Sequence, residues 1–381
     1  MYVEVRKAGF VNKGAELMLH AVIQQLEQRL PDAKVVMEPG RAQSPYPYRN
    51  RASLGLYQKA WLWRAGIPFG DLAAFVPAGI REQYGVVLDK EVNVVLDAAG
   101  FAYTDQWGPE LSVELARSSR RWRKNGTKAV LLPQAFGPYH DQRSKDAVKA
   151  FVDSCDLIYP REQVSYDYLT EITGPRNNIK LAPDFTNLVN GTRPDYFDAE
   201  RHQVCLVPNY RMLDKTGGDV AQGYVPFLER AARMLVERDA KPFLLIHEGT
   251  ADVGLAERLS KAIDGLPVLQ ENDPLAVKGI LGACRGTLGS RFHGLVSALS
   301  QGVPSLATGW SHKYEMLFAD YGFPEGVLNI NLSDEELSSA LDYLTEPTKM
   351  AALSSSLRSH SNELKARSKD MWDDVFSLIE H

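Results

Sequence analysis

The residues best suited to chemistry lie in the segment Ser290-Arg291-Phe292-His293-Gly294. It follows an apolar run ending near Leu288 and opens a helical pattern, for which Ser290 is a favourable N-cap. Ligands of open α/β sheets bind outside the carboxyl ends of strands, and helix N-termini attract anions. Arg291 matches a phosphate or carboxylate, and His293 can exchange a proton near neutral pH. The segment predicts an anion site, although a structural ion pair of Arg291 and a helix-start role for His293 fit it equally well.

Three further candidates also follow predicted strands. Arg161 could bind an anion or pair with Glu162 or Asp156. Asp184 could act as a base, accept a hydrogen bond from a sugar hydroxyl, or cap a short helix. His247 could contact a ligand or serve only the structure. The sequence has no HExxH motif, His/Cys cluster or DxD pair, so we expect no metal ion and no cofactor.

Short apolar runs alternate with amphipathic helical stretches along the whole chain. Helical spacing is clear around residues 19–30, 224–237 and 362–379. Many of the other runs are apolar throughout, as expected for parallel strands covered on both faces. The predicted strands are residues 2–5, 34–37, 93–97, 129–132, 157–159, 179–182, 204–207, 243–247, 268–270, 286–288, 305–307 and 327–330.

This alternation predicts an α/β protein with two doubly wound, Rossmann-like domains. A polar stretch rich in turn-forming residues, 190–202, divides the strand series into two halves. We therefore expect an N-terminal domain over residues 1–190 and a C-terminal domain over 200–355. Two such halves facing a central cleft resemble the GT-B fold. By analogy with that fold, we expect the helix within 361–381 to cross back to the first domain.

Bulk composition excludes several classes of protein. The 381 residues carry a formal net charge of −5, with Lys and Arg spread along the chain, so no nucleic-acid footprint is visible. Mild acidity also disfavours broad membrane capture, although a local basic patch would still allow peripheral contact. No secretory signal and no run of about 18 apolar residues occurs, which predicts a cytoplasmic protein without a transmembrane segment. The three cysteines, far apart in apolar contexts, are expected to be buried thiols.

Several blocks, in order along the chain, resemble the polysaccharide pyruvyl transferase family. The asparagine, glycine and glutamate of its opening block, the Gln-x-x-Gly-Pro block, the Arg-Glu-x-x-Ser block, the Ala-Pro-Asp block and the Arg-x-His-Gly block are all present. The chain departs from the family at 97–100, usually a glycine run, and at His312, usually a small or proline-like residue. The matching segments are Phe10-Val11-Asn12-Lys13-Gly14-Ala15-Glu16, Gln134-Ala135-Phe136-Gly137-Pro138-Tyr139, Pro160-Arg161-Glu162-Gln163-Val164-Ser165, Ala182-Pro183-Asp184, Arg291-Phe292-His293-Gly294, Gly302-Val303-Pro304 and the loop containing Lys313.

The resemblance implies transfer of the enolpyruvyl group of phosphoenolpyruvate onto two hydroxyls of one sugar, giving a pyruvate ketal and phosphate. The acceptor would be a sugar, a lipid-linked oligosaccharide or a polymer end. A GT-B glycosyltransferase or a sugar-nucleotide epimerase using a nucleotide sugar is an alternative, and a non-catalytic glycan-binding protein is a second. We assign the following candidates: His293 as the catalytic residue; Arg161, Arg291, Lys313 and Ser290 for phosphoenolpyruvate; and Asn12, Glu16, Asp184, His247 and His312 for the acceptor.

Overall fold

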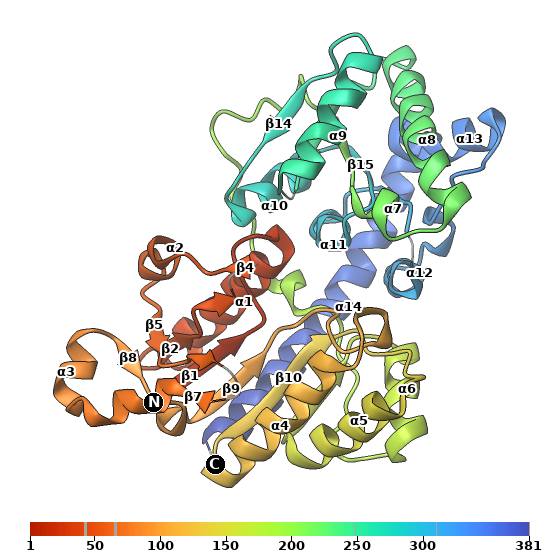
Figure 1. Cartoon of the computed structure of the whole chain (residues 1–381). Coiled ribbons are helices and arrows are strands. Elements are labelled where there is room, and N and C mark those ends of the chain that lie inside the picture. Colours follow the sequence, from red (N-terminus) through yellow and green to blue (C-terminus); the bar gives the residue numbers. More distant parts are fainter. Residues whose placement is uncertain (42–43, 65–66, 248, 310, 381) are drawn as a thin grey trace. The chain divides into compact units, whose positions relative to one another are not determined.

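The computed structural model of the chain describes residues 1–41, 44–64, 67–247, 249–309 and 311–380 (Figure 1). The chain forms two compact units. Unit 1 comprises residues 1–11, 18–185 and 368–381, and unit 2 comprises residues 12–17 and 186–367. The main division falls between Phe185 and Thr186, a few residues before the polar stretch 190–202 in which we expected the linker.

A seven-stranded parallel sheet forms the centre of unit 1, in the order β11-β10-β9-β1-β2-β5-β8. Two short antiparallel pairs, β3-β4 and β6-β7, lie outside it. The chain first winds from β1 toward β8, then returns beside β1 with β9, so the unit is doubly wound. The strands are β1 (Tyr2–Arg6), β2 (Lys34–Met37), β3 (Gly40–Arg41), β4 (Ser44–Pro45), β5 (Tyr57–Lys59), β6 (Trp63–Arg64), β7 (Ile67–Pro68), β8 (Val86–Val87), β9 (Val94–Asp97), β10 (Lys128–Gln134) and β11 (Leu157–Pro160).

Helices cover both faces of this sheet, with α4 on one face and the last part of α14 on the other (Figure 1). The end of α1 lies beside α14, where Arg29 pairs with Asp373 and its guanidinium lies 4.5 Å from the ring centroid of Phe376. The helices are α1 (Lys13–Arg29), whose first turn belongs to unit 2, α2 (Tyr48–Ser53), η1 (Phe69–Phe75), α3 (Ala78–Gln83), η2 (Asp89–Glu91), η3 (Asp105–Trp107), α4 (Glu110–Asn125), α5 (Gln142–Ser154), α6 (Gln163–Thr173) and, from residue 368, α14 (Pro347–Glu380).

Unit 2 contains a five-stranded sheet, in the order β14-β13-β12-β15-β16, with every pair parallel. Its strands are β12 (Val204–Val207), β13 (Pro242–Ile246), β14 (Val268–Gln270), β15 (Gly286–Gly289) and β16 (Ser305–Ala307). Its helices are η4 (Phe185–Leu188), which begins at the division, α7 (Arg211–Asp214), α8 (Gly218–Glu237), α9 (Gly249–Ala262), α10 (Pro274–Ala283), α11 (Phe292–Leu299), α12 (His312–Asp320), η5 (Pro324–Gly326), α13 (Asp334–Thr345) and the first part of α14.

Ten of the twelve predicted strands are confirmed within about two residues at each end. The predictions for 179–182 and 327–330 were wrong, because Ile179 and Val327 make only isolated bridges. The sequence analysis missed β5 and β8, which lengthen the sheet of unit 1 on one side. All three cysteines are buried free thiols, as predicted.

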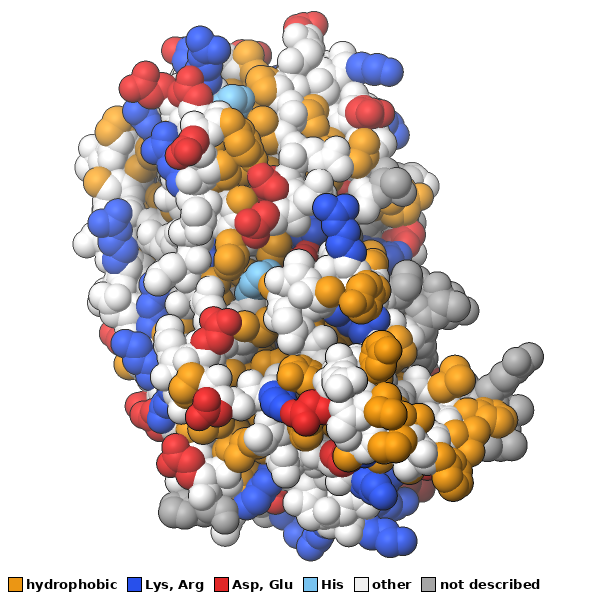
Figure 2. All heavy atoms as spheres, turned by 90° about the vertical axis from the view of Figure 1, so that its left-hand side faces the viewer, with side chains coloured by type: hydrophobic (Ala, Val, Ile, Leu, Met, Phe, Trp, Pro, Cys, Tyr) orange, Lys and Arg blue, Asp and Glu red, His pale blue; other side chains and the backbone are white. Residues whose placement is uncertain are grey.

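Apolar side chains are also exposed on unit 1, around α2, η1 and α3. Figure 2 shows hydrophobic side chains gathered on the lower part of one face. Phe75 is 85% exposed and Tyr84 is 77% exposed, which is unusual for large aromatic residues. The remaining members of this group are Tyr48, Leu62, Phe69, Leu72, Val76 and Ile80.

Candidate functional site

The topology of unit 2 places its switch point between β12 and β15. The chain winds from β12 outward through β13 to β14, then crosses over to β15 and β16 on the other side. Crossovers therefore leave in opposite directions at this point and open a crevice at the carboxyl ends of the two strands. The segment from Ser290 to His293 follows β15 directly, so it lies where open α/β sheets bind ligands.

Ser290 is buried in this loop, and both its hydroxyl group and its carbonyl oxygen make hydrogen bonds. The Tyr224 hydroxyl donates to its Oγ (2.9 Å), and the same Oγ lies 2.6 Å from Thr308 Oγ1. Asn209 Nδ2 and the Tyr314 hydroxyl both donate to its carbonyl oxygen, at 2.7 and 2.9 Å. These contacts hold the backbone before α11. The prediction that Ser290 is the N-cap was wrong, because its hydroxyl turns toward the neighbouring elements and Arg291 occupies the cap position.

Helix α11 begins with an uncapped first turn. Arg291 makes no side-chain capping hydrogen bond, and the first intrahelical bond runs from Leu295 N to Arg291 O (3.0 Å). The first backbone N–H groups of a helix have no partner within the helix, and they carry its positive dipole end. The start of α11 therefore points the positive end of its dipole toward any anion bound there.

The Arg291 guanidinium is held by a buried carboxylate. Its Nε and Nη2 donate to Asp252 Oδ2 at 3.1 and 2.5 Å. Asp252 is completely buried on α9, and its other oxygen accepts a hydrogen bond from Tyr210 N (3.0 Å). The structural ion pair left open by the sequence is thus present, and it fixes the orientation of Arg291 beside the helix start.

The first turn of α1 packs against His293, and both belong to unit 2. A Cβ added to Gly14 would lie only 2.3 Å from His293 Nδ1, so this approach requires glycine. Asn12 caps this turn, with its Oδ1 accepting from Gly14 N (2.8 Å) and Ala15 N (3.2 Å). Glu16 pairs with the ammonium of Lys13 at 2.6 Å. Two of the acceptor candidates, Asn12 and Glu16, therefore lie close to the catalytic candidate.

His247 lies at the end of β13 in the same neighbourhood. Burial lowers its pKa well below the usual value, and the positive charges of Arg291, His293 and Lys13 add to this shift. His247 is therefore neutral at pH 7. Its Nδ1 is buried and has no hydrogen-bonding partner in the part of the chain that the structure describes. A Cβ added to Gly294 would lie 3.6 Å from His247 Cδ2, which places the ring beside α11.

His312 and Lys313 form the first turn of α12, which follows β16. Lys313 Nζ lies 5.7 Å from the ring centroid of Phe292 and 5.4 Å from that of Tyr314. The Phe292 and His293 rings are in edge contact, with centroids 5.4 Å apart. Lys313 therefore brings its ammonium group to the start of α11.

Arg161 and Asp184 belong to unit 1. Arg161 Nη1 donates to Asp184 Oδ2 at 3.0 Å, and both side chains are buried. The alternative partners expected for Arg161 have other contacts, because Glu162 caps α6 through Ser165 N and Asp156 accepts from Ala129 N. Arg161 and Asp184 thus form a pair at the carboxyl end of β11.

Unit 2 contains the candidates Ser290, Arg291, His293, Lys313, His312, His247, Asn12 and Glu16. The sequence analysis missed the residues that hold this group in place. Asn209 comes shortly after β12, just as Ser290 comes after β15. The position of Asn209 after a predicted strand could therefore have marked it as a site residue. Asp252 and Tyr224 lie within helices and gave no such signal. In the described ranges, no three His, Cys, Asp or Glu side chains are grouped as metal ligands, and no helix is long and apolar enough to span a membrane.

Solved structures of similar architecture define the class of protein. Anabaena HepE in complex with UDP and glucose aligns with a TM-score of 0.57 over 99% of both chains, at 12% identity. The UDP-GlcNAc 2-epimerase of Neisseria meningitidis, bound to UDP-GlcNAc, aligns with a TM-score of 0.59 at 8% identity, over 99% of this chain and 100% of the epimerase. S. aureus MnaA, in a co-structure with UDP, aligns with a TM-score of 0.59 at 10% identity, over 100% of this chain and 96% of MnaA. The fold is therefore of the GT-B kind, as predicted.

The family follows from the sequence match. The model of the family described as polysaccharide pyruvyl transferase matches residues 12–312, which include the first turn of α1, the Arg161–Asp184 pair and the start of α11. The chain belongs to the polysaccharide pyruvyl transferase family. Membership makes it a transferase and implies a sugar or glycan acceptor.

Proposed function

We propose that this protein transfers the enolpyruvyl group of phosphoenolpyruvate to two hydroxyls of one sugar, forming a pyruvate ketal and releasing phosphate. The observation that carries the proposal is that His293, Lys313 and the positive dipole end of α11 lie together at the switch point of unit 2. This arrangement combines a proton-exchanging group with cationic and N–H donors, which is what phosphoenolpyruvate requires.

The reaction needs two proton movements and one leaving group. A proton adds to carbon 3 of phosphoenolpyruvate while carbon 2 gains positive character, and the first sugar hydroxyl attacks carbon 2 as it loses its proton. The second hydroxyl then forms the other C–O bond as it loses its proton, the bond from carbon 2 to the phosphate oxygen breaks, and the phosphate takes up that proton and leaves as hydrogen phosphate. His293 is the group assigned to exchange protons in this sequence, because an imidazole both donates and accepts near neutral pH.

The phosphate and carboxylate of the substrate are assigned to the start of α11 and to Lys313. The helix N-terminus supplies backbone donors, and Lys313 supplies a mobile charge. Arg291 contributes through the orientation that Asp252 imposes, and Arg161 is assigned to phosphoenolpyruvate on the strength of the family resemblance. Ser290 positions the loop, since its hydroxyl already contacts Tyr224 and Thr308. The reaction as proposed uses no cofactor.

The proposal is tested by incubating the protein with phosphoenolpyruvate and a panel of glycosides. Mass spectrometry should detect an acceptor heavier by one pyruvate less one water, with matching release of phosphate. His293→Ala should fold normally and lose roughly 10²–10⁴-fold in turnover, the range for a positioned acid or base. The exposed His140 offers a matched control, and His140→Ala should retain activity. Wild-type turnover in a stable His293→Ala protein would contradict the assignment.

A nucleotide-sugar enzyme is the second candidate. It is favoured by the structural likeness to HepE and to the epimerase, whose structures contain UDP or a UDP sugar. A thermal-shift screen separates the two, because the proposed function requires stabilisation by phosphoenolpyruvate. Stabilisation by a UDP sugar alone would favour the second candidate. Phosphate release that depends on added acceptor would exclude a protein that only binds glycans.

A further inference from the structure

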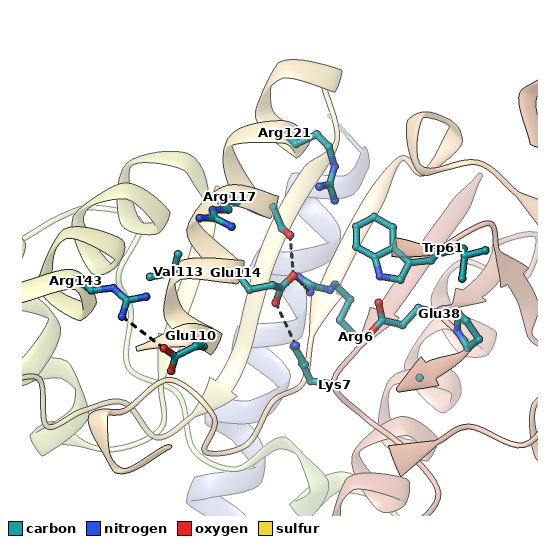
Figure 3. Close-up of a pocket in the computed structure, with 14 residues that line it drawn as sticks. Arg6, Lys7, Glu38, Trp61, Glu110, Val113, Glu114, Arg117, Arg121 and Arg143 are labelled. Atoms are coloured by element: carbon teal, nitrogen blue, oxygen red, sulfur yellow. Dashed lines mark hydrogen bonds and ion pairs between the residues drawn. The ribbon is translucent and has the colours of Figure 1, made fainter. Parts of the chain in front are cut away.

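A cavity of about 820 Å³ opens in unit 1, beside the carboxyl ends of β1 and β2 (Figure 3). Its volume lies within the range of small-molecule sites. Arg6 and Lys7 line it from the end of β1, Glu38 from the end of β2, and Arg117 from α4. Since the carboxyl ends of parallel strands are where α/β units bind ligands, the cavity occupies a functional position in the fold.

Among the lining residues, Arg6 gives the strongest evidence for a ligand, because it is 97% buried and only some of its N–H groups make hydrogen bonds. Its Nη2 donates to Glu114 Oε1 at 2.7 Å. Its Nη1 is buried and makes no hydrogen bond with any described residue, and the nearest carboxylate oxygen, Asp97 Oδ2, is 3.8 Å away. Burial alone would lower the pKa of Arg6, but Glu114 and Asp97 outweigh it and raise the pKa. A buried charged nitrogen of this kind can donate a hydrogen bond to one more oxygen atom.

The described lining carries more positive than negative charge. Five cationic and three carboxylate side chains contribute to it. Glu114 is shared by Arg6 and by Lys7, whose Nζ lies 3.2 Å from Oε2 (Figure 3). Arg117 is exposed and has no ion-pair partner among the described residues, so its guanidinium is available to a ligand. The excess of positive charge favours a ligand that carries an anionic group.

Apolar and aromatic side chains form much of the remaining wall. Trp61, Leu62, Pro39 and Val113 line the cavity together with the charged residues. The Trp61 ring is held by the guanidinium of Arg121, which lies 4.9 Å from its centroid. Rigid aromatic and apolar surface beside a few polar groups suits a ring-shaped ligand with apolar faces and polar edges.

We propose that this cavity binds a sugar that carries an anionic group, either a phosphate or a carboxylate. Arg6, Lys7 and Arg117 contact the anionic group, and Trp61 contacts the sugar ring. The assignment of this sugar as the acceptor of the pyruvyl group rests on the proposed function. Binding itself does not, because it is measured in the absence of phosphoenolpyruvate.

Isothermal titration of the whole protein tests the proposal with four probes: glucose 1-phosphate, glucuronate, glucose and inorganic phosphate. At least one of the two anionic sugars should bind ten-fold or more tightly than both glucose and inorganic phosphate. A preference for glucose 1-phosphate identifies a sugar phosphate, and a preference for glucuronate identifies a uronate. Equal binding of all four probes, or no binding of either anionic sugar at millimolar concentration, overturns the proposal.

Two variants locate the binding in this cavity. Arg117→Gln should weaken the preferred anionic sugar roughly ten-fold or more, the usual effect of losing one charge-assisted contact. Trp61→Leu should weaken the anionic sugar and glucose by similar factors, because it removes ring contact and no charge. Arg120→Gln is the matched control, since Arg120 is exposed on the same helix and does not line the cavity. An equal loss in Arg120→Gln and Arg117→Gln overturns the proposal.

A separate measurement keeps this inference distinct from the proposed function. Phosphate release from phosphoenolpyruvate is followed with the sugar that binds. Binding that depends on Arg117, without any phosphate release, supports the cavity and contradicts the transfer reaction. Acceptor-dependent phosphate release that is unaffected in Arg117→Gln and Trp61→Leu supports the transfer reaction and overturns the cavity as the acceptor site.

Discussion

Replacing Gly14 with alanine should displace His293 and lower turnover far more than stability. Gly14 is the second residue of α1, and its Cα faces the His293 ring. An added Cβ would lie 2.3 Å from Nδ1, 2.7 Å from Cγ and 2.9 Å from Cβ of His293. Because the side chain's own Cβ is among these atoms, rotation of the ring alone cannot relieve the contact.

The magnitude follows from these distances. Ordinary contacts of a Cβ begin near 3.4 Å, so one of the two groups must move by about 1 Å. A displacement of about 1 Å at a catalytic group can cost roughly 100-fold in rate. The loss of stability should stay below about 2.5 kcal/mol, because about 1–3 kcal/mol of overpacking is partly offset by the ~0.5–1 kcal/mol that alanine gains over glycine in a helix.

The assay compares turnover and melting temperature on the same preparations of Gly14→Ala and a control. Gly79 is also the second residue of a helix, α3, and has nothing within 4 Å of a Cβ. Gly79→Ala should therefore keep wild-type turnover. A folded Gly14→Ala protein with wild-type turnover would refute the view that catalysis depends on the position of His293 against α1.

Three further predictions concern charge. Asp252→Ala should lower the free energy of unfolding by about 3–5 kcal/mol in urea denaturation, because it leaves the Arg291 charge buried without its partner. Asp214→Ala, which removes a more exposed partner of Arg211, should cost less than about 1 kcal/mol. The lowered pKa of His247 means that the unfolded chain binds a proton below about pH 6.5 while the folded chain does not. Stability should therefore fall as the pH drops from 6.5 to 5, by up to ~1.4 kcal/mol per pH unit from this group, and more shallowly in His247→Gln. Turnover should survive EDTA, since helix donors and Lys313 can carry the substrate's charge; loss in EDTA that a divalent ion restores would contradict this.

The sequence predicted the sheets well because their strands are buried on both faces. Residues 204–207, all apolar and buried, can hardly occupy anything but a central strand. The two predicted strands that failed, at 179–182 and 327–330, are mostly apolar but include Lys180 and Asn329, and they make only single bridges at sheet edges. The sequence analysis missed β5 and β8 because both strands are short. In addition, β5 contains the polar residues Gln58 and Lys59, and β8 consists of only two residues. Whether each of these segments forms a strand depends on its pairing with a neighbouring strand, and the composition of a segment does not reveal that pairing.

The candidate site was predictable only in part, for a related reason. A position after a strand, beside a helix start, was enough to select Ser290, Arg291 and His293 as candidates. The partners that determine what these residues can do come from elsewhere in the chain. Asp252 lies 39 residues before Arg291, and the ring of Tyr224 reaches Ser290 across 66 residues. Gly14 gave no hint that it touches His293, because a glycine near a helix start has many ordinary explanations.

The first strands of the two units differ in a way that supports the cavity of unit 1. Both β1 and β12 stand at the switch point of their sheets, yet β12 is apolar throughout while β1 buries Glu4 and Arg6 completely or nearly so. Glu4 accepts a hydrogen bond from the equally buried Lys59 at 2.6 Å, and burial raises the pKa of its carboxyl group. Well-packed apolar residues would stabilise such a strand as well or better. Of Glu4, Lys59 and Arg6, Arg6 is the one that lines the cavity, and a charged ligand explains its place on the central strand better than stability does.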